Sequence, residues 1–408
     1  MRNSLRADWV LPIAGPPIEG GSVTIEDGRI VAVESTAPSG ATNLGRRVLM
    51  PGLVNAHTHL ELSYLHGRIP RAACFTDWVR PLLAARRTPP DQETIEAHAA
   101  DAIADAVESG TVLFGDVSNG LGALSPLRSA GMAAHVFYEL LGFNMPQPDA
   151  HVAAARSRIA AEQQAATEDG REVRFSVAAH APYSVSPALF DAIRRDTSAH
   201  GSPTTVHVAE GREEVQLLSD GTGPWRTLLE TLGVWTEAWQ VPACSPVAYL
   251  QQRGFLDAST LVVHGVQCTA DDIARLRSSG ATMVACPRSN AYVGAGDPPL
   301  SDFYAAGVPV AFGTDSLASV DDLNLFSELA EARRLAPAVA ARRLLESATL
   351  IGARALGFER DYGTLEPGKR AALLSVAVPS GVTDVEEYLL SGLTTEMRCE
   401  MPFPPPQA

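Results

Sequence analysis

The chain has 408 residues, of which 46% are hydrophobic and 19% charged, and its net charge is −15. These values are typical of a globular protein with one large domain and a small one. The acidic balance argues against a nucleic-acid partner, because no basic stripe is present to neutralise phosphates. No apolar stretch is long enough to span a bilayer, so no membrane partner is expected.

The cysteines indicate a reducing compartment. There are five, an odd number, and no two of them have Cys-x-x-Cys spacing. Residues 1–19 lack the sustained apolar core of a signal peptide. We therefore expect free thiols and a cytoplasmic location.

The two ends of the chain have β-type patterns. Near the N-terminus, the alternating runs Val23–Ile25 and Ile30–Val33 flank Asp27-Gly28, which is a strong signal for a hairpin. Near the C-terminus, a turn-rich segment at 363–368 precedes an apolar run at 371–378. We predict one small β-sandwich domain built from residues 1–50 and 362–408, with a loosely ordered proline-rich tail.

Between the ends, short apolar runs alternate with Ala-rich helical stretches. The predicted strands are Val48–Asn55, Val112–Asp116, Ala133–Glu139, Arg174–Ala179, Thr204–Val208, Thr260–His264, Thr282–Cys286 and Val308–Thr314. The helical stretches are Ile95–Ser109, Ala150–Glu168, Pro187–Arg195, Ala270–Ser278 and Asp322–Arg334. This order predicts a (β/α)8 TIM-type barrel over residues 51–361, with a doubly wound open sheet as the alternative.

His57 and His59 follow the first predicted strand of the barrel. Side chains at positions i and i+2 of a strand point the same way, so both imidazoles can reach one ion. Imidazole is a good ligand for zinc or iron. A single His-x-His pair is also common at strand ends without a metal, so this pair alone does not establish a metal site.

Further ligand-type residues follow other predicted strands. The fourth strand is followed by His180, the fifth contains His207 near its end, the sixth ends at His264, and the eighth is followed by Asp315. Five of the ten histidines therefore lie at equivalent positions, where a barrel collects its catalytic groups. Any one of them can be a polar strand cap, but together they predict a shared metal site.

Glu210 lies three residues after His207. One turn of helix would bring its carboxylate beside the metal without making it a ligand. A carboxylate in that place suits general acid/base catalysis. The alternative is a surface glutamate, because Glu213 and Glu214 follow in the same acidic stretch.

Taken as a set, these residues resemble the amidohydrolase superfamily. The matching segments are Pro51-Gly52, Asn55-x-His57-x-His59, His207-x-x-Glu210, His264-Gly265 and Gly313-Thr314-Asp315-Ser316. Many two-metal members bridge their ions with a carbamylated lysine, but the single lysine, Lys369, lies in the predicted small domain. The resemblance therefore implies one divalent ion held by His57, His59, His207 and Asp315. The less favoured alternative is a pair of ions bridged by Glu139. Zinc is expected first and iron is the alternative.

Shorter segments resemble the one-metal deaminases of this superfamily. His180-Ala181-Pro182-Tyr183-Ser184 is similar to adenosine-type and S-adenosylhomocysteine-type deaminases, and His57-x-His59-Leu60-Glu61-Leu62-Ser63 to aminodeoxyfutalosine deaminases. Phe75-Thr76-Asp77-Trp78 resembles a substrate-side loop of this group. The substrate contacts that this resemblance implies are His180, Glu61, Trp78 and Tyr183.

The implied reaction is hydrolytic deamination of an adenosine-like nucleoside, first of all 6-amino-6-deoxyfutalosine of menaquinone biosynthesis. A metal-generated hydroxide attacks the amine-bearing ring carbon, and ammonia leaves. In this scheme Glu210 protonates the adjacent ring nitrogen, Asp315 accepts a proton from water, and His264 orients the hydroxide or stabilises the tetrahedral intermediate. The expected partner is a small nucleoside-like molecule, and a homodimer is left open.

Two other functions are compatible with these residues. One is different amidohydrolase chemistry: deamination of S-adenosylhomocysteine, methylthioadenosine or guanine, or hydrolysis of an imidazolone-type or chlorinated ring. The other is an inactive barrel that acts as a binding protein. Retention of Glu210 and of every expected ligand argues against an inactive barrel.

Overall fold

The computed structural model describes residues 2–168 and 172–393. The predicted loosely ordered tail and Cys399 lie outside these ranges. The other four cysteines are free thiols, as expected. None of the helices in the described ranges combines the length and the hydropathy that a membrane span requires.

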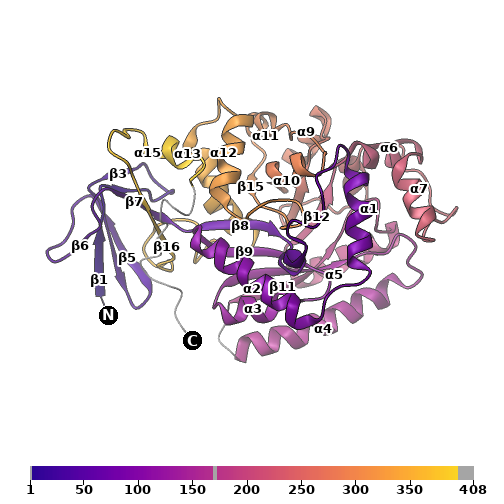
Figure 1. Ribbon diagram of the computed structural model, residues 1–408, viewed down its shortest axis with the longest axis horizontal. Helices are drawn as coiled ribbons and strands as arrows, with labels where there is room; N and C mark the ends of the chain where they lie inside the picture. The colour runs from indigo at the N-terminus through magenta and orange to yellow at the C-terminus, as the bar shows by residue number, and fades with distance from the viewer. Residues whose placement is uncertain (1, 169–171, 394–408) are drawn as a thin grey trace.

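A parallel barrel forms the larger part of the molecule (Figure 1). Its strands are β8 (Leu53–Thr58), β9 (Thr111–Ser118), β10 (Ala133–Leu140), β11 (Val173–Ala179), β12 (Thr204–Val208), β13 (Thr260–His264), β14 (Thr282–Ala285) and β15 (Val310–Phe312). They pair in two runs, β8 to β11 and β12 to β15. Backbone hydrogen bonds join the runs on both sides: His207 N donates to His180 O at 2.8 Å, and Asp315 N donates to His57 O at 3.1 Å. The carboxyl ends of all these strands therefore meet at one rim.

Helices surround the barrel and follow its strands in the chain (Figure 1). The α-helices are α1 (Phe75–Arg86), α2 (Gln92–Glu108), α3 (Leu124–Ser129), α4 (Pro148–Glu168), α5 (Pro187–His200), α6 (Arg212–Asp220), α7 (Pro224–Thr231), α8 (Pro246–Gln252), α9 (Ala270–Ser279), α10 (Pro287–Tyr292), α11 (Leu300–Ala306), α12 (Leu325–Leu335), α13 (Ala341–Glu346), α14 (Gly352–Ala355) and α15 (Val385–Leu389). A 3-10 helix, η1 (Leu60–Leu65), follows β8, and a π-helix, η2 (Ser347–Ile351), precedes α14.

A β-sandwich lies at one end of the molecule, opposite α6 and α7 (Figure 1). One sheet has the order β5-β4-β1-β6 and the other β16-β7-β2-β3. The strands are β1 (Arg2–Arg6), β2 (Trp9–Val10), β3 (Ile18–Glu19), β4 (Ser22–Glu26), β5 (Arg29–Glu34), β6 (Thr42–Asn43), β7 (Arg47–Pro51) and β16 (Leu373–Ala377). Buried apolar residues of both sheets form one cluster, which includes Leu5, Val23, Leu49 and Leu373. The strands of the sandwich thus come from both ends of the chain.

The predicted fold class, a (β/α)8 barrel with a flanking β-sandwich, is confirmed. The predicted hairpin is also present, because β4 and β5 pair antiparallel around Asp27 and Gly28, both of which have positive φ. The exact division into domains at residues 50/51 and 361/362 stays a prediction.

The single strand predicted over Val48–Asn55 is wrong. Two strands occupy this segment: β7 pairs with β16 in the sandwich, and β8 pairs with β9 in the barrel. Gly52 separates them, and its backbone packs closely against Val112 of the barrel. An added Cβ would lie 2.2 Å from Val112 Cγ1, which is far inside van der Waals contact. Glycine therefore allows the chain to pass from one sheet to the other.

We expect Gly52→Ala to destabilise the protein by about 1–3 kcal/mol, because the new methyl group overpacks a buried junction. Denaturant unfolding of the variant and the wild type measures this difference. Gly15→Ala is the matched control, since a Cβ at Gly15 meets no atom within 4 Å. Equal stability of the two variants would contradict the packing argument.

Candidate active site

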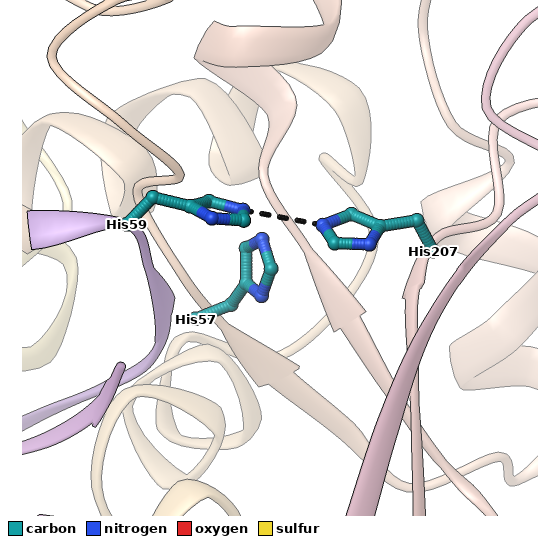
Figure 2. Close-up of side chains that lie close together, drawn as sticks. All are labelled: His57, His59 and His207. Atoms are coloured by element: carbon teal, nitrogen blue, oxygen red, sulfur yellow. Dashed lines mark hydrogen bonds between the residues drawn. The ribbon is translucent and has the colours of Figure 1, made fainter. Parts of the chain in front are cut away.

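Three histidine rings converge at the carboxyl rim of the barrel (Figure 2). His57 lies in β8, His59 directly follows this strand, and His207 comes from β12, which lies across the barrel. The Nε2 atoms of His59 and His207 are 3.2 Å apart. His57 lies between the other two rings, with its centroid 4.9 Å from each of theirs. The structure therefore brings together the three predicted histidine ligands.

The hydrogen bonds and pKa values of these rings indicate their protonation states. Burial lowers the pKa of His59 to about 3 and holds the pKa of His207 well below its usual value, so both rings are neutral. Nδ1 of His207 donates to the backbone oxygen of His180 at 2.9 Å, which leaves its Nε2 as an acceptor. Both ring nitrogens of His57 are buried without a hydrogen-bond partner among the described residues.

Asp315, three residues after the end of β15, completes the group. Its Oδ1 lies 3.7 Å from Nε2 of His57 and 3.6 Å from Nε2 of His59. Its Oδ2 accepts hydrogen bonds from Oγ of Ser289 at 2.6 Å and of Ser319 at 3.1 Å. Burial opposes ionisation of this carboxyl, but the interaction with His57 and the other imidazoles outweighs it and holds its pKa well below the usual value. One carboxylate oxygen therefore faces the histidines.

These residues fit a divalent metal ion. Two nitrogen ligands about 2.0–2.1 Å from one tetrahedral zinc ion are roughly 3.3 Å apart. The 3.2 Å between the Nε2 atoms of His59 and His207 is close to that value. Two imidazole nitrogens at this distance need either a cation or a proton between them. The unpartnered nitrogens of His57 point to the same conclusion.

Glu210 lies in the turn between β12 and α6. The predicted turn of helix at this residue is wrong, because α6 begins only at Arg212. Ala209, with φ at 52°, redirects the chain instead. Oε1 of Glu210 lies 3.7 Å from Nε2 of His264. Burial, helped by the charges of Asp315 and Glu214, raises the pKa of Glu210 well above its usual value.

His264 ends β13, and its ring orientation is fixed by Asn290. Nδ1 of His264 donates to Oδ1 of Asn290 at 2.9 Å, so Nε2 is the acceptor that faces Glu210. Burial lowers the pKa of His264 to about 4, which keeps the ring neutral. The side chain can therefore accept a hydrogen bond inside the site but carries no charge there.

Left-handed backbone conformations recur at this rim. Ala209, His264 and Asp315 all have φ between 52° and 74°, a region that side chains with a Cβ rarely adopt. Such strain persists only where the surrounding structure holds it, and it concentrates at functional sites. Here it turns the residues after three strands toward the common centre.

The predicted substrate residues His180, Tyr183 and Trp78 line one side of the rim. His180 lies beside His207, with the ring centroids 5.0 Å apart, and its Nδ1 pairs with Oγ of Ser184 at 2.5 Å. Tyr183 stacks on Trp225 at 3.9 Å between centroids. Trp78 stacks on Phe75 in the same apolar cluster. An aromatic wall thus adjoins the histidines.

Glu61 has a different environment. Its carboxylate accepts hydrogen bonds from Oγ of Ser118 at 2.6 Å and from the backbone N–H groups of Asn119, Gly120 and Gly122 at 2.8–3.3 Å. These bonds hold the loop after β9. The contacts favour a structural role, and the prediction that Glu61 touches substrate stays untested.

The sequence did not reveal several partners of these residues. Ser289, Ser319 and Asn290 bond to Asp315 and His264, but nothing in the sequence distinguishes them from ordinary helix-start residues. The run Pro287-Arg288-Ser289-Asn290 directly after β14 was the available signal, because polar residues at a strand end face the same rim.

Comparisons with known proteins place the chain among metal-dependent hydrolases of one family. The model of the amidohydrolase family matches residues 48–394. The 5-methylthioadenosine/S-adenosylhomocysteine deaminase of Moorella thermoacetica is 29% identical over 90% of this chain and 83% of its own length. The aminodeoxyfutalosine deaminase of Deinococcus radiodurans is 31% identical over 78% and 76%. The zinc-bound structure of an adenosine deaminase from Xanthomonas campestris superposes with a TM-score of 0.81, at 26% identity over 97% and 90% of the two chains.

The chain belongs to the amidohydrolase family. Within that family it is a deaminase with a histidine-rich site for a divalent metal ion.

Proposed function

We propose that the protein hydrolytically deaminates an adenosine-like nucleoside and that 6-amino-6-deoxyfutalosine is its substrate. The observation that carries this proposal is the buried carboxyl of Glu210, 3.7 Å from His264 and at the same rim as His57, His59, His207 and Asp315. The 31% identity to the aminodeoxyfutalosine deaminase of Deinococcus radiodurans supports the choice of substrate.

His57, His59, His207 and Asp315 would hold one ion, for which we propose zinc. When bound, the ion would supply a water molecule activated for attack at neutral pH. The bound zinc of the Xanthomonas campestris adenosine deaminase supports zinc over iron.

Glu210 is proposed as the proton donor. A carboxyl with a raised pKa keeps its proton near neutral pH and can give it to the ring nitrogen next to the amine-bearing carbon. Protonation makes that carbon more electrophilic. The same group can later carry a proton to the departing ammonia.

Asp315 and His264 are proposed to act on the attacking water. Oδ1 of Asp315 is the carboxylate oxygen left without a hydroxyl partner. The low pKa of the group keeps it ionised, so Oδ1 can accept the hydrogen of the attacking water. Nε2 of His264 is a neutral acceptor opposite Glu210 and can orient the same water. The side chains of His180, Tyr183 and Trp78 would contact the rest of the substrate.

A substrate panel tests the proposal. Purified protein loaded with zinc is assayed for ammonia release from 6-amino-6-deoxyfutalosine, 5′-methylthioadenosine, S-adenosylhomocysteine and adenosine. We expect the highest kcat/KM for 6-amino-6-deoxyfutalosine. If none of the four substrates released ammonia, the proposal that this protein deaminates nucleosides would be wrong.

5′-Methylthioadenosine or S-adenosylhomocysteine is the second candidate substrate. It is favoured by the relatives of that name, since the Moorella thermoacetica deaminase aligns over 90% of this chain. The aromatic wall of Tyr183, Trp225 and Phe75 also suits an apolar substituent. The highest kcat/KM for one of these two compounds would replace our first choice of substrate.

A further inference from the structure

Glu139 stands behind the proposed metal ligand His207 and has no part in the mechanism described above. It lies near the end of β10, and its side chain is buried. Its Oε1 has no hydrogen-bond partner among the described residues, and Nδ1 of His207 lies 3.4 Å from it. A buried carboxylate oxygen is costly to leave unpaired, so its position calls for an explanation.

We infer that Glu139 is a positioning residue for His207, which it supports from the side of the ring that faces away from the metal. The hydrogen on Nδ1 of His207 is donated to the backbone oxygen of His180 at 2.9 Å, and Oε1 of Glu139 adds a second acceptor oxygen beside the same N–H. Such outer partners fix the tautomer of a metal-bound imidazole and make it a stronger ligand. This inference rests on the metal site of the proposed function.

The position of the Glu139 carboxylate is itself fixed by Asn119. Nδ2 of Asn119 donates to Oε2 of Glu139 at 2.9 Å and to its backbone oxygen at 3.1 Å. Oδ1 of Asn119 in turn accepts a hydrogen bond from Arg86 at 2.8 Å. The amide can therefore present only its N–H groups to Glu139. A chain of polar contacts thus runs from Arg86 through Asn119 and Glu139 to His207.

Glu139, His180 and His207 are also close enough to hold an ion of their own. The hydrogen bonds argue against a second ion at this place. Nδ1 of His207 is the ring nitrogen nearest Glu139, and it cannot bind an ion because it carries the hydrogen that the backbone oxygen of His180 accepts. Only Glu139 and His180 would remain as ligands. We therefore assign Glu139 to the support of one ion and not to a second.

Glu139→Gln tests the inference with little change in shape. In glutamine an NH2 group, which is a hydrogen-bond donor, replaces one carboxylate oxygen. This NH2 must face either the N–H of Asn119 or the N–H of His207, so two donors face each other and no hydrogen bond forms between them. We expect zinc affinity, measured by competition with a chelator, to fall about 10- to 100-fold. Thermal unfolding of the zinc-free variant and wild type shows whether the fold itself has changed.

Glu328→Gln is the matched control. Glu328 is another fully buried glutamate with an unpartnered Oε1, but it bonds to the backbone of Arg288 on α10. This control variant should bind zinc like the wild type, whatever its stability. Unchanged zinc affinity in Glu139→Gln would overturn the inference. A wild type that binds two zinc ions and a variant that binds one would also overturn it, in favour of a second ion.

Zinc affinity is measured without substrate, so the result is independent of ammonia release. If Glu139→Gln weakens zinc binding while no nucleoside is deaminated, the positioning role stands and the proposed reaction fails. If nucleosides are deaminated and zinc affinity is unchanged, the reaction stands and the positioning role fails.

Discussion

Glu210→Gln is expected to reduce kcat by about 10²–10⁴-fold while leaving the zinc content unchanged. The substitution keeps the size of the side chain but removes the acidic proton that the proposed reaction delivers to the ring nitrogen. Zinc content should be unaffected, because His57, His59, His207 and Asp315 are the proposed ligands and Glu210 is not. Ammonia release and metal analysis on the same preparation measure both quantities.

Glu213→Gln is the matched control for this experiment. Glu213 lies three residues further along, at the start of α6, and is partly exposed. This control should keep the turnover and the zinc content of the wild type. Normal turnover in Glu210→Gln would show that another group transfers the proton. Loss of zinc would instead place Glu210 among the ligands.

The pH dependence of the wild type should follow from the same carboxyl. Burial raises the pKa of Glu210 well above its usual value, so the group is protonated and able to act as an acid below that pKa. As the pH rises through it, the proton is lost and kcat should fall. The residual kcat of Glu210→Gln should not fall at alkaline pH, because glutamine has no proton to lose in this range. A wild-type profile that keeps rising on the alkaline side would contradict the assignment of Glu210 as the acid.

The barrel and most of the proposed ligands could be predicted from the sequence because their signals are local. His57 and His59 share one face of a strand by simple alternation, and strand ends in a barrel all meet at one rim. The prediction of the strands was wrong at the junction between the sandwich and the barrel. The apolar run 48–55 resembles one strand, and only the pairing of its two parts in different sheets shows that it is two.

The supporting contacts were not predictable, because they join residues far apart in the chain. Asn119 directly follows β9 and Glu139 lies in β10. The sequence suggested Glu139 only as a bridging group between two ions, and it gave no sign that Asn119 binds this residue. The backbone conformation of Ala209 was also unforeseen, since alanine gives no sign of a positive φ. A sequence shows which side chains can bind a metal ion, but their orientation depends on contacts made after folding.

His207→Ala should have an effect of a different kind from Glu210→Gln, because it removes a ligand. His207 is the one histidine of the three that comes from the far side of the barrel, and its Nε2 lies 3.2 Å from that of His59. Without it the ion would keep ligands from β8 and β15 only. We expect zinc affinity to fall by more than about 100-fold, which exceeds the usual effect of losing an outer partner.

Turnover at limiting zinc should fall together with the metal content. His66→Ala is the control, since His66 is an exposed histidine at the end of η1 and should leave both unchanged. Thermal unfolding of the zinc-free proteins separates ligand loss from misfolding, because the two variants should then resemble the wild type. Glu210→Gln loses turnover and keeps zinc, whereas His207→Ala loses both. Wild-type zinc affinity in His207→Ala would remove this residue from the ligand set, and the close approach of the Nε2 atoms of His59 and His207 would need another explanation.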